Sequence, residues 1–295
     1  MYERLKLAIC LAALVALGYL FFPGHTYLQE DSQIYLAILH HLADPQVLAR
    51  DPVAVYHHMT YTIYDELALA AHRLTHLEFH PILVADQLLF RGAGLLGVYL
   101  LVTAMGLSRR AAILVTAVFG LGATVAGPSV LVVEYEPKPR SSAIPAVFLA
   151  AGLLAHRRYW AAGIAGAVGF LYHRPSTYPF WIASAAWSIL ASRTKQDTTS
   201  FWKLWIPLGV ASLVSLIGAR LQLGGGADSV WFGRIDAELE QIQRFRAPYN
   251  WVSMWWERWI WHYLTILAAV LVGIRRLKLD WSSPTGLLAL TMPVT

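Results

Sequence analysis

Glu30 and Asp31 form an acidic pair about eight residues after the first long apolar run of the chain. A carboxylate at this position could take a proton from an acceptor hydroxyl or hold a metal ion. Asp31 also precedes Ser32, where a helix is expected to begin, so the alternative role is a helix N-cap. The two roles are compatible, because a capping carboxylate can still reach a substrate.

A second charged segment runs from Glu134 to Arg140 and contains two prolines, which stiffen it. Lys138 and Arg140 could hold a phosphate or diphosphate, with the arginine making bidentate bonds. Glu134 or Glu136 could pair with these cations or bind a metal. The alternative is a surface loop whose charges neutralise one another.

Four further ionisable residues lie at or near the ends of apolar runs. His173 and Arg174 occupy a short turn, whereas Asp86 and Arg91 fall inside an apolar run, five residues apart. Charges within a membrane span are costly and usually mark a site, a pathway or an ion pair. For Asp86 and Arg91 the alternative is that both lie near the outer end and pair or snorkel. A cavity shared by these loop ends would explain the recurrence of charge.

The histidines invite a comparison with zinc sites. His72 and His76 are spaced i, i+4, but the intervening residues lack the glutamate of an HExxH motif. We therefore expect interfacial histidines rather than a zinc site. The single cysteine, Cys10, excludes a disulfide framework and any multi-cysteine metal centre within the chain.

The composition is that of a membrane protein. Hydrophobic residues make up 57% of the 295 residues and charged residues 14%, against about 25% charged in a soluble domain. The mean hydropathy is +0.49, and the 12 Trp and 14 Tyr are typical of membrane interfaces. The sequence thus predicts one all-α polytopic membrane helix bundle over residues 1–295, with about eight or nine spans.

Apolar runs of about 17–25 residues mark candidate spans, although several runs here are shorter. The runs cover Leu5–Phe22, 81–105, 111–133, 141–156, 159–172, 177–192, 202–220 and 259–274. A ninth run begins near Ser283 and reaches only Thr295. Because a span needs about 20 residues, we expect this run to dip into the bilayer or to belong to a longer protein.

The distribution of charge predicts an orientation. If the N-terminus is inside, the inner segments hold 12 of the 23 basic residues and only three of the 18 acidic ones. This asymmetry follows the positive-inside rule and indicates a cytoplasmic N-terminus. The net charge of +5 is therefore a signal of topology, and we do not expect nucleic acid as a partner.

Most of the outer mass lies in two long loops, residues 23–80 and 221–258. The first loop predicts two amphipathic helices. One carries the apolar stripe Ile34, Tyr35, Ile38, Leu39 and Leu42. The other begins at Asp51-Pro52, with Asp51 as its cap, and carries the stripe Tyr56, Ile63, Leu67, Ala71 and Leu74. The second loop ends in a tryptophan cluster over 251–261, which is typical of an aromatic belt.

Taken together, the pattern resembles the GT-C class of integral-membrane glycosyltransferases, in an uncharacterised bacterial branch. The resemblance rests on the segment Gln29–Leu36 after the first span, on Glu134–Arg140 before an Ala/Leu-rich span, and on Gly169–His173. It covers residues 1–220 and concerns architecture more than exact motifs.

This resemblance implies transfer of a hexose or pentose from a polyprenyl-phosphate donor on the outer face of a bacterial plasma membrane. It makes Asp31 the expected base, with Glu30 as its substitute. By position, Lys138, Arg140 and Arg174 would bind the lipid phosphate. The other expected substrate-binding residues are Glu134, Glu136, His173 and Arg91. Some members of the class need a divalent metal and others do not, so the metal remains open, as do protein partners.

Two other functions remain alternatives. A transporter or flippase of a lipid-linked or anionic substrate would use Asp86 and Arg91 to line a path, and would be expected to show paired broken helices in related halves. The sequence contains no evident internal duplication. The second alternative is a non-catalytic scaffold that keeps the architecture.

Overall fold

The computed structural model describes residues 2–29, 31–55, 62–122, 132–193, 200–222, 236–248, 251–280, 283 and 285–286. Over these residues it consists of helices joined by loops and contains no strand. The N-terminal helices are α1 (Tyr2–Leu20), α2 (Ser32–Ala43), α3 (Pro52–Val55) and α4 (Ile63–Thr75). The central helices are α5 (Phe79–Ala104), α6 (Arg109–Gly120), α7 (Pro139–Ala155), α8 (Tyr159–Tyr172), α9 (Arg174–Arg193) and α10 (Trp202–Gln222). The last are α11 (Ala237–Arg246), α12 (Val252–Arg258) and α13 (Ile260–Arg276). The prediction of an all-α fold is confirmed over these residues.

Several helices follow the predicted apolar runs closely. Helix α8 has the predicted bounds, and α5 differs from the predicted run by two residues at its start and one at its end. Helix α6 ends at Gly120, well before the predicted residue 133, and 123–131 lie outside the described residues. Of the predicted ninth run, only residues 283, 285 and 286 are described.

Two helices among the described residues are long and apolar enough to cross a bilayer, Phe79–Ala104 and Trp202–Leu221. Helices α7 and α8 are apolar but shorter. Together with the hydrophobic composition, these helices indicate a membrane-associated protein.

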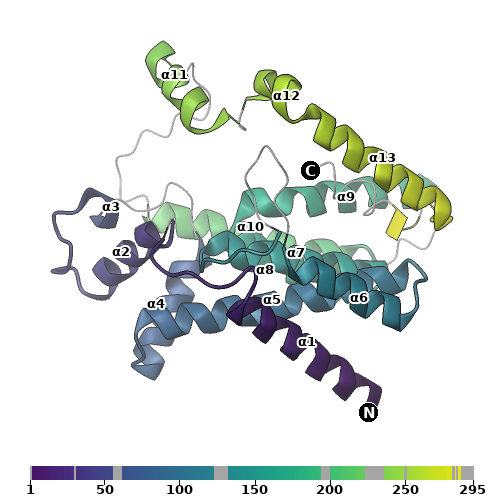
Figure 1. Ribbon diagram of the computed structural model, residues 1–295. Coiled ribbons are helices and arrows are strands. Elements are labelled where there is room, and N and C mark those ends of the chain that lie inside the picture. The colour runs from purple at the N-terminus through teal and green to yellow at the C-terminus, as the bar shows by residue number, and fades with distance from the viewer. Residues whose placement is uncertain are drawn as a thin grey trace.

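The centre of the bundle is a close packing of α5 on α7, of α7 on α8, and of α8 on α10 (Figure 1). Glycines make the closest of these contacts possible. A Cβ on Gly97 of α5 would overlap the backbone of Phe148 and Leu149 in α7, and a Cβ on Gly94 would lie 2.7 Å from Pro145 Cβ. Small residues at a helix interface are the usual way for membrane helices to approach closely. This packing fixes α5 against the start of α7.

Helices α2 and α4 cover one end of this bundle. Their buried residues Leu36, Leu39 and Tyr64 share an apolar cluster with Phe79 at the start of α5 and Tyr172 at the end of α8. In addition, Thr62 Oγ1 donates to the carbonyl of Tyr172 at 2.9 Å. Helices α2 and α4 thus form a cap on the bundle.

The second amphipathic helix differs from the sequence prediction. The structure divides it into α3 and α4, with residues 56–61 outside the described part of the chain. Asp51 caps α3 as predicted, because its Oδ1 accepts from the amides of Val53 and Ala54 at 2.8 and 3.2 Å. Thr62 caps α4, and its extended backbone rules out a helix running through this position.

The predicted stripe on α4 is confirmed at Ile63, which packs against the apolar cluster, and wrong at Leu67 and Leu74. Its buried residues are Tyr64, Asp65 and Ala68, whereas Leu67 and Leu74 are exposed. The reason is that the Tyr64 ring packs against Tyr35 of α2 and Tyr172 of α8, and its hydroxyl donates to the carbonyl of Pro137, which sets the rotation of the helix. In the α2 stripe, by contrast, Ile38 and Leu39 are buried as predicted, although Ile34 is exposed.

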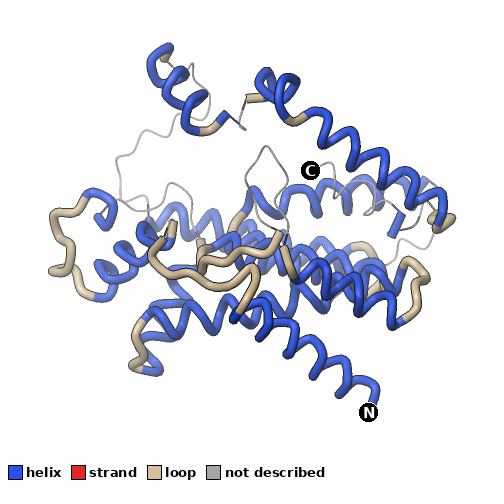
Figure 2. The backbone as a smooth tube through the Cα atoms, viewed as in Figure 1, coloured by secondary structure: helices blue, strands red, loops and turns tan. Residues whose placement is uncertain are grey.

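Two loops lie side by side on one face of the bundle (Figure 2). One follows α1 and the other precedes α7. Their backbones are joined by a hydrogen bond from the amide of Thr26 to the carbonyl of Tyr135, 3.0 Å long. This contact brings the segment before Asp31 next to the segment that contains Glu134, Glu136 and Lys138.

Candidate functional site

Side chains of α5 and α4 hold the segment 132–138 in place through hydrogen bonds to its backbone. The carbonyl of Glu134 accepts from Gln87 Nε2 at 2.9 Å and from Arg91 Nη2 at 2.7 Å. At the other end of the segment, Tyr64 Oη donates to the carbonyl of Pro137 at 3.2 Å. These bonds satisfy backbone groups that are buried away from water, and they fix the course of the segment.

The segment ends where α7 begins. Lys138 occupies the N-cap position, and Pro139 follows at the first helical position, which its fixed φ favours. Ser141 Oγ accepts from the amide of Lys138 at 3.2 Å and donates to the carbonyl of Lys138 at 2.7 Å. With the backbone of Lys138 fixed in this way, its side chain is directed into the protein.

Three carboxylates surround the ammonium of Lys138. Its Nζ lies 3.2 Å from Glu134 Oε2 and 3.7 Å from both Asp31 Oδ2 and Glu136 Oε2. Glu134, Glu136 and Lys138 are almost completely buried, with exposures of 4%, 0% and 2%. A buried ion pair persists only if its geometry and its hydrogen bonds are good.

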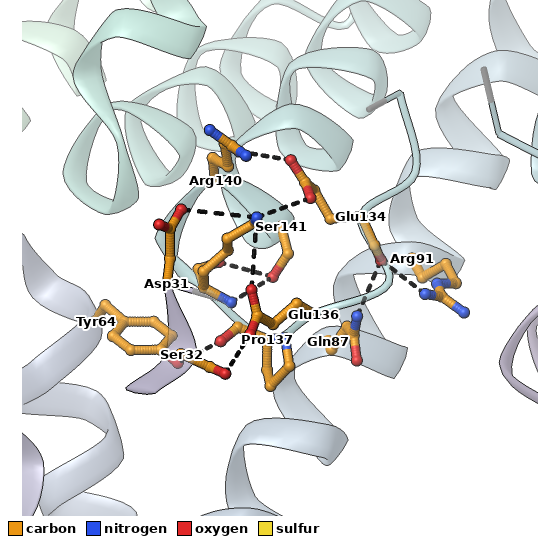
Figure 3. Close-up of polar contacts among 11 residues, drawn as sticks. Asp31, Ser32, Tyr64, Gln87, Arg91, Glu134, Glu136, Pro137, Arg140 and Ser141 are labelled. Atoms are coloured by element: carbon orange, nitrogen blue, oxygen red, sulfur yellow. Dashed lines mark hydrogen bonds and ion pairs between the residues drawn. The ribbon is translucent and has the colours of Figure 1, made fainter. Parts of the chain in front are cut away.

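The carboxylates have such partners. Arg140 Nε lies 2.5 Å from Glu134 Oε1, and Ser32 Oγ donates to Glu136 Oε1. Ser32 Oγ in turn accepts from the amide of Leu28 at 3.0 Å. We call Asp31, Glu134, Glu136, Lys138 and Arg140 the Lys138 cluster (Figure 3).

The Lys138 cluster opens to solvent at one end. The side chain of Asp31 is 48% exposed and that of Arg140 is 27% exposed, whereas the other three members are covered. Tyr35 stands one turn after Asp31 on α2; burial, and then the charge of Asp31, raises the pKa of its hydroxyl to about 12. We call this exposed end of the cluster its mouth. It carries the carboxylate of Asp31, the guanidinium of Arg140 and the neutral phenol of Tyr35.

These contacts decide two alternatives. Asp31 stands at the N-cap position of α2, but its side chain makes no capping hydrogen bond and pairs with Lys138 instead. The helix-cap interpretation of Asp31 is therefore wrong. The interpretation of 134–140 as a surface loop is also wrong, since Glu134, Glu136 and Lys138 are buried. Its charges do pair with one another as that alternative expected, and Lys138 also pairs with Asp31.

His173 lies within electrostatic range of Arg140, whereas the side chain of Arg174 lies beside Phe170. His173 Nδ1 is 2.8 Å from Ser176 Oγ. Burial, and then the charge of Arg140, lowers the pKa of the His173 imidazole to about 4, so the ring is neutral at physiological pH. The Arg174 guanidinium lies 5.8 Å from the ring centre of Phe170. The charge of Arg140, a member of the Lys138 cluster, thus acts on the His173 ring.

Asp86 and Arg91 have separate partners. Asp86 accepts from Ser142 Oγ at 2.6 Å and from Tyr172 Oη at 2.8 Å. Arg91 Nη2 donates to the carbonyls of Glu134 and Gly24. The predicted pairing of Asp86 with Arg91 is not among the ion pairs of the described residues. Glu30, the predicted substitute for Asp31, lies outside the described residues.

The carboxylates do not fit a divalent metal as they stand. The point on which Asp31, Glu134 and Glu136 converge is occupied by Lys138 Nζ, so a metal there would have to displace a buried ammonium. No other cluster of three His, Cys, Asp or Glu among the described residues is arranged to hold a metal. His72 Nδ1 lies 2.6 Å from the carbonyl of Leu77, and His76 ends α4 in a left-handed conformation.

Sequence reasoning missed four residues that hold the cluster in place, namely Ser32, Tyr64, Gln87 and Ser141. Ser32 and Ser141 had a local signal, since each is one to three residues from a charged residue at a helix start. Tyr64 had none, because its partner is 73 residues away along the chain.

The sequence matches no protein-family model and no curated protein, and the fold matches no solved structure.

Proposed function

We propose that the protein is a polytopic membrane glycosyltransferase that moves a hexose or pentose from a polyprenyl-phosphate donor to an acceptor hydroxyl. The observation that carries this proposal is the ion pair between the half-exposed Asp31 and the buried Lys138, with Arg140 beside them. A fixed carboxylate next to a fixed guanidinium provides a base and an anion-binding group at one mouth. The GT-C resemblance of the sequence points to the same reaction.

In this proposal Asp31 accepts the proton of the acceptor hydroxyl. The hydroxyl oxygen forms a bond to the anomeric carbon of the sugar. The bond from that carbon to the phosphate oxygen breaks, and its electron pair leaves with the lipid phosphate. Arg140 stabilises the departing phosphate through the N–H groups that do not bind Glu134.

Lys138 has a positioning role in this scheme. It is too buried to meet a substrate, and it holds the carboxylate of Asp31 at 3.7 Å from its ammonium. No step is assigned to a metal ion, because Lys138 occupies the point where three carboxylates meet.

We further propose that the chain crosses a bacterial plasma membrane eight or nine times, with a cytoplasmic N-terminus. The support is the alternation of basic residues between short loops and the two helices of full membrane length. With that orientation the mouth at Asp31 faces the outer side, where a polyprenyl-phosphate donor would present its sugar.

The test is sugar transfer in vesicles that contain the purified protein and labelled polyprenyl-phosphate hexose or pentose. Asp31→Asn should insert normally and lose transfer by about 100-fold or more, as expected for a general base. Asp44→Asn is the matched control, because Asp44 is another exposed carboxylate of the same loop. Absence of transfer by the unmodified protein, or normal transfer by Asp31→Asn combined with Glu30→Gln, would contradict the proposal.

A further inference from the structure

The starts of α1, α6 and α8, which carry basic residues, lie at one end of the helix bundle. Thr103 Oγ1 near the end of α5 is 3.2 Å from Nε2 of His156, which follows α7, so these two helices end at the same level. Short loops lead from there into α6 and α8. Arg109 at the start of α6 lies 3.7 Å from Glu3 in the first turn of α1. The bundle thus gathers its short basic loops at the end opposite the Lys138 cluster.

A compact patch at this end combines cations with exposed tryptophans. Arg157 and Arg158 join α7 to α8, and both side chains are exposed. Trp160 follows in the first turn of α8 and is 42% exposed, and its ring centre lies 5.4 Å from that of Trp202, which begins α10 and is 50% exposed. Lys203 comes next, with its Nζ 5.6 Å from the ring centre of Trp202. We call these five residues the Arg157 patch.

The backbone beneath the patch is fixed. The amides of Arg157 and Arg158 donate to carbonyls in the last turn of α7, at 2.8 and 2.9 Å. With a φ of 56° at Arg157, this is the Schellman ending of a helix. On the other side of the patch, a Cβ on Gly163 of α8 would lie only 2.6 Å from the carbonyl oxygen of Leu204 in α10, so glycine lets these two helix starts pack together. The cations are therefore carried on a fixed frame.

The cations of the patch have no acidic partner. Over the described part of the chain, no carboxylate lies within ion-pair distance of Arg157, Arg158 or Lys203. The hydrogen bond from Lys203 Nζ to Ser200 Oγ, 3.5 Å long, does not neutralise the ammonium. Uncompensated cations beside exposed tryptophans are typical of the level of phospholipid head groups, where phosphates supply the opposite charge.

An apolar stripe continues from the patch along α10. Ile206, Val210, Leu213 and Ile217 are between 45% and 58% exposed, and their spacing puts them on the same face of the helix as Trp202. Helix α10 is also one of the two described helices that are long and apolar enough to cross a bilayer. Patch and stripe together match a molecule with an anionic head and an apolar tail.

We propose that the Arg157 patch binds an anionic phospholipid of the surrounding bilayer. The two guanidinium groups and the Lys203 ammonium donate to oxygens of the head-group phosphate. The indole rings of Trp160 and Trp202 pack against the glycerol region, and one acyl chain lies along the stripe on α10. The stripe favours a lipid over free phosphate, and the exposed cations favour an anionic lipid over a zwitterionic one.

This lipid site is separate from the mouth at Asp31. Arg140 of the mouth lies in the first turn of α7, and Arg157 follows its last turn. Because α7 has 17 residues, each rising about 1.5 Å, the two sites are about 25 Å apart. The inference therefore goes beyond the proposed sugar transfer and does not depend on it.

The experiment is native mass spectrometry of the purified protein titrated with phosphatidylglycerol or with phosphatidylcholine of the same acyl chains. The unmodified protein should retain one phosphatidylglycerol in preference to phosphatidylcholine, whose choline group cancels the charge of the phosphate. Arg157→Gln/Arg158→Gln should weaken this retention about 25-fold, because each basic side chain beside an anionic lipid contributes roughly a factor of five. Arg157→Lys/Arg158→Lys keeps the charge and should recover most of the retention. Both side chains are exposed, so these variants should fold.

Arg109→Gln/Arg110→Gln is the matched control, because it removes two adjacent exposed arginines from the start of α6, a helix that packs on α5 and α1. This variant should retain the lipid, and so should Asp31→Asn, which separates the inference from the proposed sugar transfer. Four results would overturn it: equal retention by Arg157→Gln/Arg158→Gln, equal retention of phosphatidylcholine, displacement of the lipid by excess inorganic phosphate, or an equal loss in the control. The last result would indicate a diffuse attraction by all basic residues of this end.

Discussion

Lys138 and Arg91 are two buried cations on either side of one short segment, and they are compensated in opposite ways. Lys138 is surrounded by three carboxylates, whereas Arg91 has only backbone carbonyls as partners. In the Lys138 cluster the three carboxylates outnumber the two cations, Lys138 and Arg140, by one. At Arg91 the guanidinium donates to two backbone carbonyls through Nη2, and its Nη1 is buried with no hydrogen-bond partner among the described residues. A buried cation is thus held by carboxylates on one side of the segment and by backbone carbonyls on the other.

Removal of the Lys138 ammonium should have the largest effect on the free energy of unfolding. Lys138→Met leaves Glu134 and Glu136 buried without their shared cation, and breaking a buried pair in this way costs about 3–5 kcal/mol. We expect a loss of this size in the free energy of unfolding, measured by denaturant titration in mixed micelles. The double variant Lys138→Met/Glu136→Gln should recover part of it. A single variant as stable as the unmodified protein would show that the carboxylates are protonated or hydrated instead.

Arg91→Met is the corresponding change on the other side, and its effect should be smaller. It removes hydrogen bonds to the carbonyls of Glu134 and Gly24 but strands no charge. Gln87 still donates to the Glu134 carbonyl, so the Gly24 carbonyl is the acceptor that loses its partner. We expect a loss of about 1–3 kcal/mol in the same titration, the usual range for an unsatisfied buried acceptor. If Arg91→Met were more destabilising than Lys138→Met, the distinction between the two cations would fail.

The helical fold and several residues of the two sites could be predicted from the sequence alone. It predicted the all-α fold from apolar runs, and it singled out Asp31, Lys138, Arg140 and Arg91 from their residue types at loop ends. The two segments are 104 residues apart at the contact between Ser32 and Glu136, so local patterns could not show that they meet. The same limitation explains the α4 stripe, because a tertiary contact of Tyr64 sets the rotation of that helix.

The pH dependence of stability tests the environment of His173, which lies near Arg140 of the Lys138 cluster. Its pKa falls from 6.5 to about 4 in the folded protein, chiefly through burial and then through Arg140, so folding favours the neutral ring. The unfolded chain binds the proton first as the pH falls, and stability should therefore decline from pH 6.5 towards 4. After allowance for partial exposure we expect a decline on the order of 1 kcal/mol.

The measurement for His173 is the pH dependence of the unfolding free energy of the unmodified protein minus that of His173→Gln. The subtraction removes the carboxylates that titrate in the same range. A difference that stays flat between pH 6.5 and 4 would show that His173 is not held neutral near Arg140.

The smallest effect on stability should come from Asp31, although it is the member of the cluster on which the proposed chemistry depends. Its side chain is 48% exposed and lies 3.7 Å from Lys138, and exposed pairs contribute about 0.2–1 kcal/mol. Glu136→Gln is the matched change at a carboxylate that is also 3.7 Å from the same ammonium but fully buried. Glu136→Gln should therefore destabilise the protein several times more than Asp31→Asn in the micelle titration. Equal losses would mean that Asp31 is as structural as Glu136, and a carboxylate needed for folding to that degree would be a poor base for a substrate hydroxyl.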